Sequence, residues 1–399
     1  MTIHAGRHAI VAGGGIGGLT AALYLARAGF RVSILERAPV LEEVGAGLQV
    51  PPNASRILDD LGVLEPLQRQ ALQPQNIRIR RGKDGADLSR LALDDAETRW
   101  GAPYLAAHRA DLHRALLDRV ALEPAISLYL DRAVAGCQIR GQEVQVGIRR
   151  GPLRLSETAD LLIGADGLHS AVRARLYAQD PLTFSGLTAW RGLIDARAAP
   201  ASLRLPESNI WFGAKQHLVH YPIRAGQCVN VVAIIDDTWT AAPNAQDWDT
   251  AADAGTVTAR FARWHQDARA LIATVPAWRK WPLYERPLIP SYVEDRIALL
   301  GDAAHPMMPF LAQGAAMAIE DAASLGRALR ATSDIPAALK SYNAMRLQRT
   351  QRVQKEAKKQ ARISHLSGPA AVVRDIGMRM MGQKRLLKRY DWLYAPQQS

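Results

Sequence analysis

The chain has 399 residues, of which 48% are hydrophobic and 22% are charged. This composition allows a large core and two or three domains, and it excludes a wholly disordered chain. The two cysteines, Cys137 and Cys228, lie far apart and in no metal-ligand spacing, so we expect a reduced cytoplasmic protein without a structural metal or disulfides. The glycine-rich N-terminal stretch lacks the basic lead-in and the cleavage context of a signal peptide.

The net charge of +12 is concentrated near the C-terminus, where residues 346–389 hold 13 Lys or Arg and two acids. A nucleic-acid-binding surface and a solvated helical tail both fit such a segment. Because no aromatic residues are interleaved with these charges, we favour the helical tail and expect no nucleic-acid partner. A basic surface also attracts anionic small molecules.

The first residues of the chain predict a strand, a glycine turn, a helix and a second strand. Residues 9–12 form a short apolar run, and Leu19 and Leu23 follow at helical spacing. Residues 31–35 form the second strand, which ends at Glu36.

The rest of the chain alternates between similar strand–turn segments and β-rich sequence. We expect a helix at 109–120, antiparallel strands near 125–150 and a buried strand that runs into a turn at 160–167. Short β-like segments fill 181–285, and the chain after 312 is mostly helical.

The apolar run at 297–319 is long enough to span a bilayer. It contains Asp302, His305 and two prolines, so we expect no membrane span there.

The glycine turn near the N-terminus carries a dinucleotide fingerprint. Gly13, Gly15 and Gly18 form G-x-G-x-x-G between a strand and a helix, where glycine permits a tight turn and the close approach of a pyrophosphate. Glu36 ends the next strand, where a carboxylate can hold ribose hydroxyls. A purely structural tight turn is the alternative, but the context and the acid favour a dinucleotide.

Two further turns place an aspartate after an apolar strand. "GADG" at 164–167 carries Asp166, and "GDAAH" at 301–305 carries Asp302. Either turn alone fits an ordinary β-turn built on Asp and Gly. Together with the glycine fingerprint, they favour a nucleotide site.

These motifs together make the chain resemble the FAD-dependent single-component aromatic hydroxylases, the group with salicylate hydroxylase, 3-hydroxybenzoate 6-hydroxylase and 6-hydroxynicotinate 3-monooxygenase. The resemblance covers nearly the whole chain. Its motifs fall in order: the fingerprint at 13–18, "HRADL" at 108–112, "GADGLHSAVR" at 164–173, "WRG" at 190–192, "HLVHYP" at 217–222, "GDAAHP" at 301–306 and "DWLYAP" at 391–396.

The resemblance implies an α/β fold with three parts: a discontinuous Rossmann-like FAD-binding domain, an inserted β-rich substrate domain and a C-terminal helical segment. We place the FAD-binding domain at 1–75, 100–180 and 285–335, the substrate-binding sheet at 76–99 and 181–284, and the helical segment at 336–399.

The resemblance also implies how non-covalent FAD binds. The three glycines would approach the pyrophosphate, Glu36 the adenosine ribose, and Arg37 would lie beside the adenosine. Arg109 would lie near the phosphate–ribityl region, and Asp166 in a turn that this group uses for both FAD and NAD(P)H.

The stretch from 301 to 316 would serve the flavin ring. Asp302 would hold a ribityl hydroxyl, and the prolines would stiffen the loop. The small residues Gly314, Ala315 and Ala316 would open a helix whose backbone N–H groups stabilise negative charge on the reduced flavin.

The substrate would meet the strand "HLVHYPI". Alternation puts His217 and Tyr221 on one face and His220 on the other, with about 13 Å between the first two. A buried structural histidine is the alternative, but in the resembling enzymes both positions face the substrate and the histidine acts on the phenol.

Four further residues are candidates for the substrate pocket: Gln49, Trp190, Trp211 and Pro309. The tryptophans are most simply core residues. Gln49 stands where the hydroxynicotinate enzyme has a histidine, and Pro309 where the 3-hydroxybenzoate 6-hydroxylase type has a glutamine. These differences argue against both of those specific substrates.

The resulting hypothesis is a monooxygenase that hydroxylates a phenolic or hydroxylated aromatic acid with NADH or NADPH and dioxygen, through a flavin C4a-hydroperoxide, with His217 as the base. One alternative is an FAD-dependent oxidoreductase acting on a non-aromatic alkene, and the other a weakly active flavin-binding regulatory protein. The sequence leaves the oligomeric state open, with a homodimer as one option.

Overall fold

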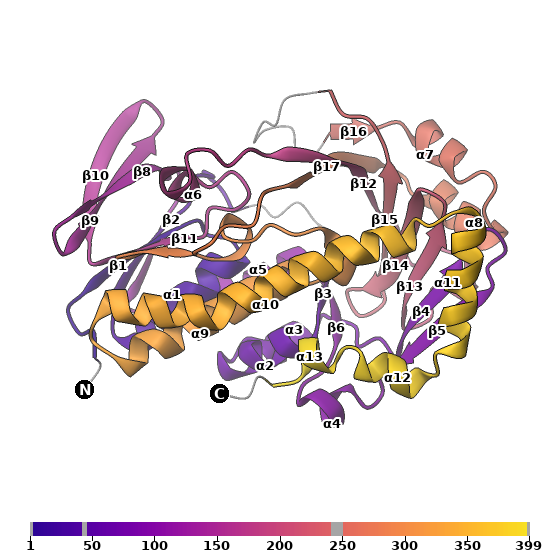
Figure 1. Ribbon diagram of the computed structural model, residues 1–399, viewed down its shortest axis with the longest axis horizontal. Helices are drawn as coiled ribbons and strands as arrows, with labels where there is room; N and C mark the ends of the chain where they lie inside the picture. Colours follow the sequence, from indigo (N-terminus) through magenta and orange to yellow (C-terminus); the bar gives the residue numbers. More distant parts are fainter. Residues whose placement is uncertain (1–2, 42–45, 241–249, 397–399) are drawn as a thin grey trace.

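The computed structural model describes residues 3–41, 46–240 and 250–396. Residues 1–2, 42–45, 241–249 and 397–399 belong to the segments that we placed at 1–75, 181–284 and 336–399, and they lie outside the described residues. The described chain is elongated, with one large sheet towards each end, and helix α10 (Ile335–Ser364) runs alongside both (Figure 1).

The first sheet is Rossmann-like. Its strand order is β18-β19-β11-β1-β2-β7, and every neighbouring pair is parallel except β18–β19. The central strands are buried along their length, because helices pack against the sheet and the strands at 133–159 also cover it, with Val144, Val146 and Ile148 in the same core. The strands are β1 (His8–Ala12), β2 (Arg31–Leu35), β7 (Ile126–Tyr129), β11 (Leu161–Gly164), β18 (Val293–Glu294) and β19 (Ile297–Leu299).

Three helices pack around this sheet: α1 (Ile16–Ala28), α5 (Arg109–Ala121) and α9 (Gly314–Ala331). In α5 the side chains of Leu112, Leu116 and Val120 are buried, which confirms the predicted apolar face. The chain therefore places its glycine turn, the start of α5 and the start of α9 around the same sheet.

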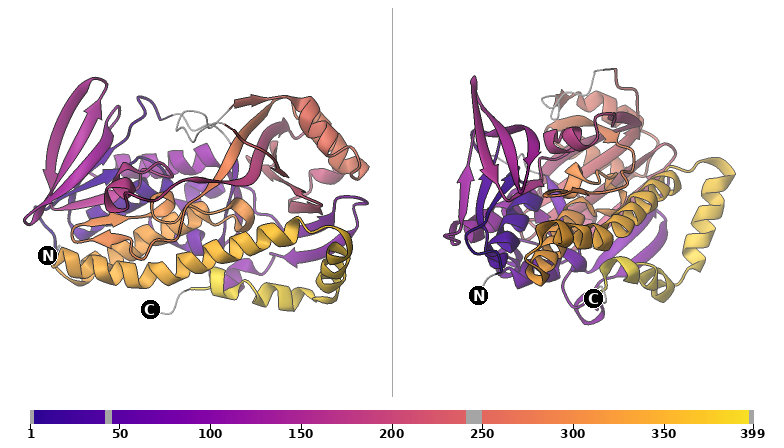
Figure 2. Two further views of the ribbon diagram at one scale, coloured as in Figure 1. Left: turned by 45° about the horizontal axis from the view of Figure 1, so that its top comes forward. Right: turned by 60° about the vertical axis from the view of Figure 1, so that its left-hand side comes forward.

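We expected antiparallel strands throughout the region near 125–150, but the first strand of this region is parallel to its neighbour. This strand, β7, follows helix α5 and pairs in parallel with β2, because a helical crossover returns the chain in the same direction. Only the next three strands form an antiparallel meander: β8 (Ala133–Arg140), β9 (Glu143–Arg150) and β10 (Leu153–Ala159). This meander projects at one end of the molecule (Figure 2).

The second sheet has eight strands in the order β16-β17-β12-β15-β14-β13-β4-β5. All neighbours are antiparallel except β13 and β4. The strands are β4 (Asn76–Arg81), β5 (Asp87–Ala92), β12 (Thr183–Asp195), β13 (Glu207–Gly213), β14 (Gln216–Ile223), β15 (Cys228–Asp236), β16 (Thr250–Ala252) and β17 (Trp278–Glu285).

The two faces of this sheet have different surroundings. The outer face packs with α7 (Ala254–Arg260) and α8 (Gln266–Thr274) around Trp211, Leu218 and Val231. The opposite face, which we call the inner face, carries His217, Val219 and Tyr221 of β14 and, on the neighbouring strands, Phe212, Asn230, Ile234 and Asp236. Val219 and Tyr221 pack there against Ala106.

A small two-stranded sheet supports the inner face. It pairs β3 (Gly47–Val50) with β6 (Leu105–His108), and β6 contacts β14. Because β6 leads directly into α5, the same short segment touches the second sheet and begins a helix of the first.

The C-terminal residues are helical, as predicted. After α10 the chain turns back along the second sheet through α11 (Gly368–Met380), α12 (Gln383–Lys388) and α13 (Asp391–Tyr394) (Figures 1 and 2). The basic charges are not all solvated. Arg346 is buried and pairs with Glu320 and Asp321 at 2.6 Å, and Arg349 pairs with Glu320 at 2.6 Å, so these two anchor α10 to α9.

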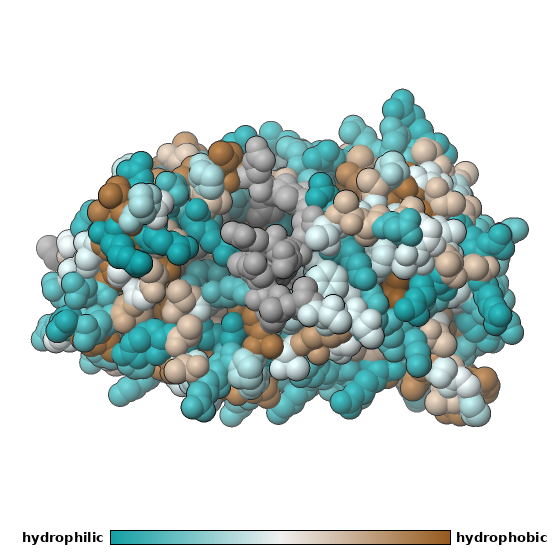
Figure 3. All heavy atoms as spheres, turned by 90° about the horizontal axis from the view of Figure 1, so that it is seen from above, coloured by the Kyte–Doolittle hydropathy of each residue, from teal (hydrophilic) through white to brown (hydrophobic). Residues whose placement is uncertain are grey.

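Short helices and turns complete the described fold: α2 (Pro52–Asp60), α3 (Leu64–Gln68), α4 (Ala96–Trp100), α6 (Ala171–Leu176) and the single turns η1 (Ala201–Leu203), η2 (Gly301–Ala303) and η3 (Pro309–Leu311). Within the described residues, every helix is too short or too polar to cross a bilayer. On the face seen from above, hydrophobic side chains are scattered among hydrophilic ones (Figure 3).

Candidate active site

The glycine turn brings backbone groups to an open surface. Gly13 has φ +104°, and a Cβ there would lie 2.5 Å from the carbonyl oxygen of Ala165. A Cβ on Gly18 would collide with the Gly13 carbonyl oxygen, so both positions require glycine. Gly15 faces open space and no side chain caps the start of α1, which leaves N–H groups available to an anion.

Glu36 lies beside this turn at the end of β2. Its Oε2 accepts a hydrogen bond from the Gly14 N–H at 2.7 Å, and its Oε1 accepts one from the Ala38 N–H at 2.8 Å. The carboxylate is therefore held in a defined position next to the glycine turn. Arg37 is exposed, and its charge contributes to lowering the pKa of His169, after burial of that ring and the charge of Arg286.

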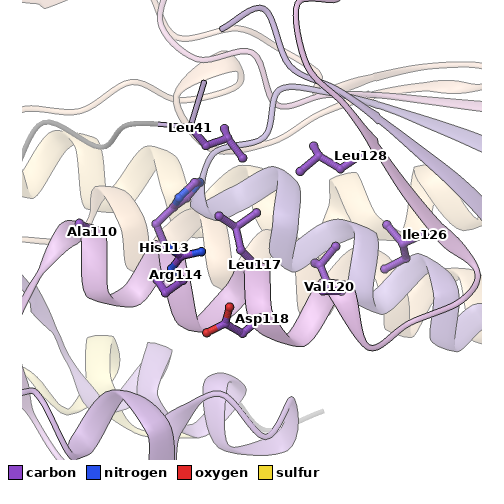
Figure 4. A pocket seen from close by; sticks show the side chains of 10 residues that line it. Leu41, Ala110, His113, Arg114, Leu117, Asp118, Val120, Ile126 and Leu128 are labelled. Atoms are coloured by element: carbon purple, nitrogen blue, oxygen red, sulfur yellow. The ribbon is translucent and has the colours of Figure 1, made fainter. Parts of the chain in front are cut away.

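A pocket of about 520 Å³ opens between α5 and β7, near Leu41 (Figure 4). His113 and Leu117 of α5 and Leu128 of β7 line it, and Nε2 of His113 lies 2.7 Å from the Gly14 carbonyl oxygen. The pocket belongs to the first sheet and its glycine turn, not to the sheet that carries His217.

Asp166 follows β11 in the second predicted turn. Its Oδ2 accepts a hydrogen bond from the Ala171 N–H at the start of α6, at 2.8 Å. Its Oδ1 is buried and makes no hydrogen bond within the described residues. Burial raises the pKa of this carboxyl. One buried acceptor thus remains for a further partner.

Asp302, in the turn η2 that follows β19, and Arg109, at the start of α5, interact electrostatically. Asp302 reaches solvent, but protein atoms crowd its carboxyl group, and this desolvation raises its pKa against the opposing charges of His305 and Arg109. Arg109 begins α5 with an exposed side chain, and its N–H donates to the Ala46 carbonyl at 2.9 Å.

The loop that leads to α9 is anchored by Asp321, a residue of α9 itself. Nε2 of His305 lies 2.5 Å from Oδ2 of Asp321, which also accepts from the Gly301 N–H at 2.9 Å. Helix α9 begins at Gly314. A Cβ on Gly314 would point into open space, and no side chain caps the start of the helix. Gly314 and Ala315 are half-buried and Ala316 is buried, and no side chain at this helix start is larger than a methyl group.

His217 lies on the inner face next to this loop. Its ring is buried and lies 4.9 Å from that of Phe310, measured between ring centroids. Its Nδ1 lies 2.8 Å from Nε2 of His365. Burial, and secondarily the charge of His365, holds the pKa of His217 well below its usual range, so the ring is neutral at ordinary pH.

Tyr221 packs against Gly47, where no larger residue fits. A Cβ on Gly47 would lie 2.6 Å from Cγ of Asn230 and 2.8 Å from Cε2 of Tyr221. The Gly47 N–H donates to Oδ1 of Asn230 at 2.8 Å, which locks β3 against the sheet. Burial raises the pKa of Tyr221, while Arg191 opposes this shift, so the phenol keeps its proton and can donate it.

Gln49 links the small two-stranded sheet, where it lies on β3, to β13 of the second sheet. Its Nε2 donates to Oγ of Ser208 at 3.0 Å, and its Oε1 accepts a hydrogen bond from the hydroxyl of Tyr104. Burial, followed by the nearby Tyr221, raises the pKa of Tyr104. Pro309 opens the turn η3 and is exposed, one residue before Phe310.

Two pocket candidates do not reach the inner face. Trp190 and Trp211 are both buried in the outer cluster. The Nε1 of Trp190 donates to Thr188 at 3.0 Å, and the guanidinium of Arg80 stacks 3.9 Å from the ring of Trp211. Strand alternation points both away from His217, so the structure places them as core residues of the sheet.

Five residues on or beside the inner face were not singled out from the sequence: Tyr104, Phe310, His365, Asp236 and Gly47. His365 ends a long helix, and Asp236 ends a strand without any motif. Tyr104 lies four residues before the "HRADL" motif, Phe310 directly follows Pro309, and Gly47 lies two residues before Gln49, so these three lie close enough to a recognised signal to have been found by it.

The residues around the first sheet fit FAD. The uncapped start of α1 suits a pyrophosphate, and Glu36 stands where a ribose would lie. Asp302 and Arg109 are opposite charges that act on one another, and the uncapped N-terminus of α9 suits the polar edge of a flavin ring. The geometry suits a flavin-dependent enzyme that carries a second large sheet beside the sheet with the glycine turn.

Comparisons with known proteins agree with this description. A family model described as an FAD binding domain matches residues 7–357, and the chain belongs to that family. The 3-amino-4-hydroxybenzoate 2-monooxygenase PtnB3 of Streptomyces platensis is 37% identical, over 99% of this chain and 97% of its own. The 3-hydroxybenzoate 6-hydroxylase of Klebsiella oxytoca is 33% identical, over 97% and 96%.

A solved structure shows the same architecture. Klebsiella pneumoniae HpxO complexed with FAD and uric acid superposes with a TM-score of 0.84 at 26% identity, covering 97% of this chain and 96% of that one. The chain is thus an FAD-dependent aromatic monooxygenase, with NAD(P)H as reductant. These relatives support neither the alkene oxidoreductase nor the regulatory flavoprotein that the sequence left as alternatives.

Proposed function

We propose that this enzyme hydroxylates a phenolic aromatic acid of the salicylate or hydroxybenzoate type, with dioxygen as the second substrate. One observation carries the proposal. His217 and Tyr221 share the inner face, and His217 contacts Phe310 in the loop that leads to the open start of α9. A ring bound there would lie between a base, a phenol and the proposed flavin edge.

The first sheet holds FAD in this proposal. Gly13, Gly15 and Gly18 receive the pyrophosphate, Glu36 the ribose, and Asp302 a ribityl hydroxyl. Arg37 lies beside the adenosine, Arg109 beside the phosphates, and Asp166 in the turn shared with NAD(P)H. Bound FAD supplies hydride uptake from NAD(P)H and activation of dioxygen.

His217 takes the proton of the substrate phenol in this proposal. A phenolate is a better nucleophile than a phenol, so proton removal prepares the ring carbon for attack on oxygen. The base must be neutral beforehand, and the lowered pKa of His217 meets this requirement. The burial of its ring also keeps water from the reacting oxygen.

Tyr221 orients the substrate. Its raised pKa keeps the hydroxyl protonated, so it can donate a hydrogen bond to an anionic group of the acid. Gln49 and Tyr104 form the adjoining wall, and Pro309 shapes the turn before Phe310. The names of the relatives place hydroxybenzoates and an aminohydroxybenzoate among their substrates, which supports an acid of this class.

The test is a substrate screen with the FAD-loaded protein. Salicylate, 3-hydroxybenzoate, 4-hydroxybenzoate and 3-amino-4-hydroxybenzoate are each added with NADH or NADPH, and benzoate, which has no phenol, serves as the control. We expect at least one phenolic acid to accelerate NAD(P)H oxidation and to gain one oxygen atom by mass spectrometry. Hydroxylation of benzoate alone, or of none of these acids, would refute the proposal.

A further inference from the structure

Three side chains form a path from His217 to the surface. Nδ1 of His217 lies 2.8 Å from Nε2 of His365, and Nδ1 of His365 lies 3.1 Å from Oδ1 of Asp236. The side chain of His365 is 10% exposed and that of Asp236 is 41% exposed. The path therefore leads from a buried ring to a carboxylate in contact with solvent.

The carboxylate sets the tautomer of both rings. An ionised carboxylate only accepts hydrogen bonds, so the proton of neutral His365 is on Nδ1 and its Nε2 is an acceptor. The contact between the rings then requires the proton of His217 on Nδ1. Nε2 of His217 is left with its lone pair, which is the form that a general base needs.

The electrostatics favour moving a positive charge outward along this path. Burial and the neighbouring His365 both lower the pKa of His217. Burial also lowers the pKa of His365, but there the hydrogen bond and the charge of Asp236 oppose the shift. A proton is therefore less costly on His365 than on His217.

Few other charged groups face this path. Arg374 on α11 donates to the carbonyls of Ile363 and Ser364 and pairs with Asp375. Arg260 on α7 donates to the backbone carbonyl of Asp236 at 3.2 Å, and Lys215 meets His365 through a backbone hydrogen bond. Asp236 is the only carboxylate bonded to His365 in the described part of the chain.

We propose that His365 and Asp236 are positioning residues that hold His217 as the Nδ1–H tautomer and carry its proton to solvent. The phenol O–H bond breaks as Nε2–H forms on His217, and the Nδ1 proton of His217 passes to Nε2 of His365. The Nδ1 proton of His365 then passes to Asp236 and on to water. This inference rests on the proposed role of His217.

A first test observes the tautomers without turnover. The FAD-loaded protein is labelled with ¹⁵N-histidine, and ring nitrogen shifts are recorded between pH 5 and pH 8. We expect His217 to carry its proton on Nδ1 throughout, and Asp236→Asn to yield a mixture of tautomers. Asp237→Asn is the matched control, because that carboxylate instead contacts Thr188 and Lys280. A proton on Nε2 of His217 in the unaltered protein would overturn the proposal.

A second test measures proton removal. Asp236→Asn and His365→Gln are assayed for product formed per NAD(P)H consumed, with the phenolic acid that the substrate screen identifies and with its ring-fluorinated analogue, whose phenol is more acidic. We expect a loss of at least about tenfold with the first acid and a smaller loss with the analogue, because an ionised phenol needs no base. Asp236→Glu should restore activity. Damage to the fold alone would affect both acids equally.

The two tests also separate this inference from the proposed function. If His217→Ala abolishes coupled hydroxylation while Asp236→Asn and His365→Gln behave like the unaltered protein, the base is correct and the relay is wrong. If no phenolic acid is hydroxylated, the proposed function fails, whereas the tautomer measurement still decides whether the hydrogen-bonded path exists.

Discussion

In the turn at residues 13–18, the groups that we propose for FAD are backbone N–H groups of one short segment, whereas on the inner face the groups that we propose for the substrate are side chains from distant segments. The turn needs only glycine at the right spacing and a strand and a helix around it. The inner face needs β3, β6, β14 and the 301–313 loop to meet. Local sequence can therefore specify the first region but not the second.

The same contrast applies within the second sheet. His217 and His220 are three residues apart on one strand, and both rings are buried. His217 contacts Phe310 and His365, whereas His220 lies beside Trp211 in the outer core, 6.3 Å between ring centroids. Burial alone does not distinguish a proposed base from a core residue, but the face of the strand does.

The largest expected effect comes from removing the proposed base. His217→Ala should lower the amount of product formed per NAD(P)H consumed by about 10²–10⁴-fold. Without the base, the phenol of the substrate keeps its proton, and its aromatic ring reacts poorly with oxygen. FAD binding and substrate-stimulated NAD(P)H oxidation should persist, so hydrogen peroxide should accumulate. The measurement is the ratio of hydroxylated product to NAD(P)H consumed.

His220→Ala is the matched control on the outer face. It removes an equally buried histidine from the same strand, so its ratio of product to NAD(P)H should stay close to that of the unaltered enzyme. If the His217 variant remains coupled, or the His220 variant is the more damaged one, the assignment of the two faces to core and catalysis fails.

A smaller effect is expected on the flavin side. Asp302→Ala should weaken FAD binding by about ten- to a hundredfold, because a lost hydrogen bond to a charged group costs about 1.5–3 kcal/mol. The fold should persist, since the Asp302 side chain makes no hydrogen bond that supports the described loop, which His305 and Asp321 anchor. Fluorescence titration of the apoprotein with FAD measures this, and an unchanged affinity would contradict the ribityl role.

The smallest effect concerns acid stability and sharpens the contrast between the two histidines. Burial, with a smaller contribution from Arg80, lowers the pKa of His220 from 6.5 to about 3. The unfolded chain therefore binds one more proton than the native state between these values. This group's contribution to stability is complete above pH 6.5 and is lost as the pH falls towards 3.

Replacing that ring by phenylalanine tests this linkage. Between pH 7 and pH 5, His220→Phe should reduce the fall in unfolding free energy by about 2 kcal/mol relative to the unaltered protein, since one linked proton contributes about 1.4 kcal/mol per pH unit. Urea unfolding at the two pH values provides the measurement. Other buried histidines, such as His217, should keep part of the slope in both proteins. An identical fall in both proteins would show that His220 titrates normally.

The sequence by itself determined the strand–turn–helix–strand unit at the N-terminus, its dinucleotide fingerprint and the strand faces of β14, whereas FAD as the dinucleotide came from the family resemblance. The first three follow from short-range rules: glycine where φ is positive, helical spacing after it, and side chains that alternate along a strand. The same rules predicted His217 and Tyr221 on one side, and the structure shows them there.

Only the tertiary structure decided which face of β14 lies against the 301–313 loop and which residues from distant segments lie beside His217. Trp190 and Trp211 lie in the outer core because that face is covered by α7 and α8, which no local pattern announces. His365 reaches His217 only because α10 is anchored to α9 by the buried Arg346 and extends along both sheets to end at the inner face. Contacts between residues about 150 positions apart depend on packing, and packing is not encoded in any short stretch of the chain.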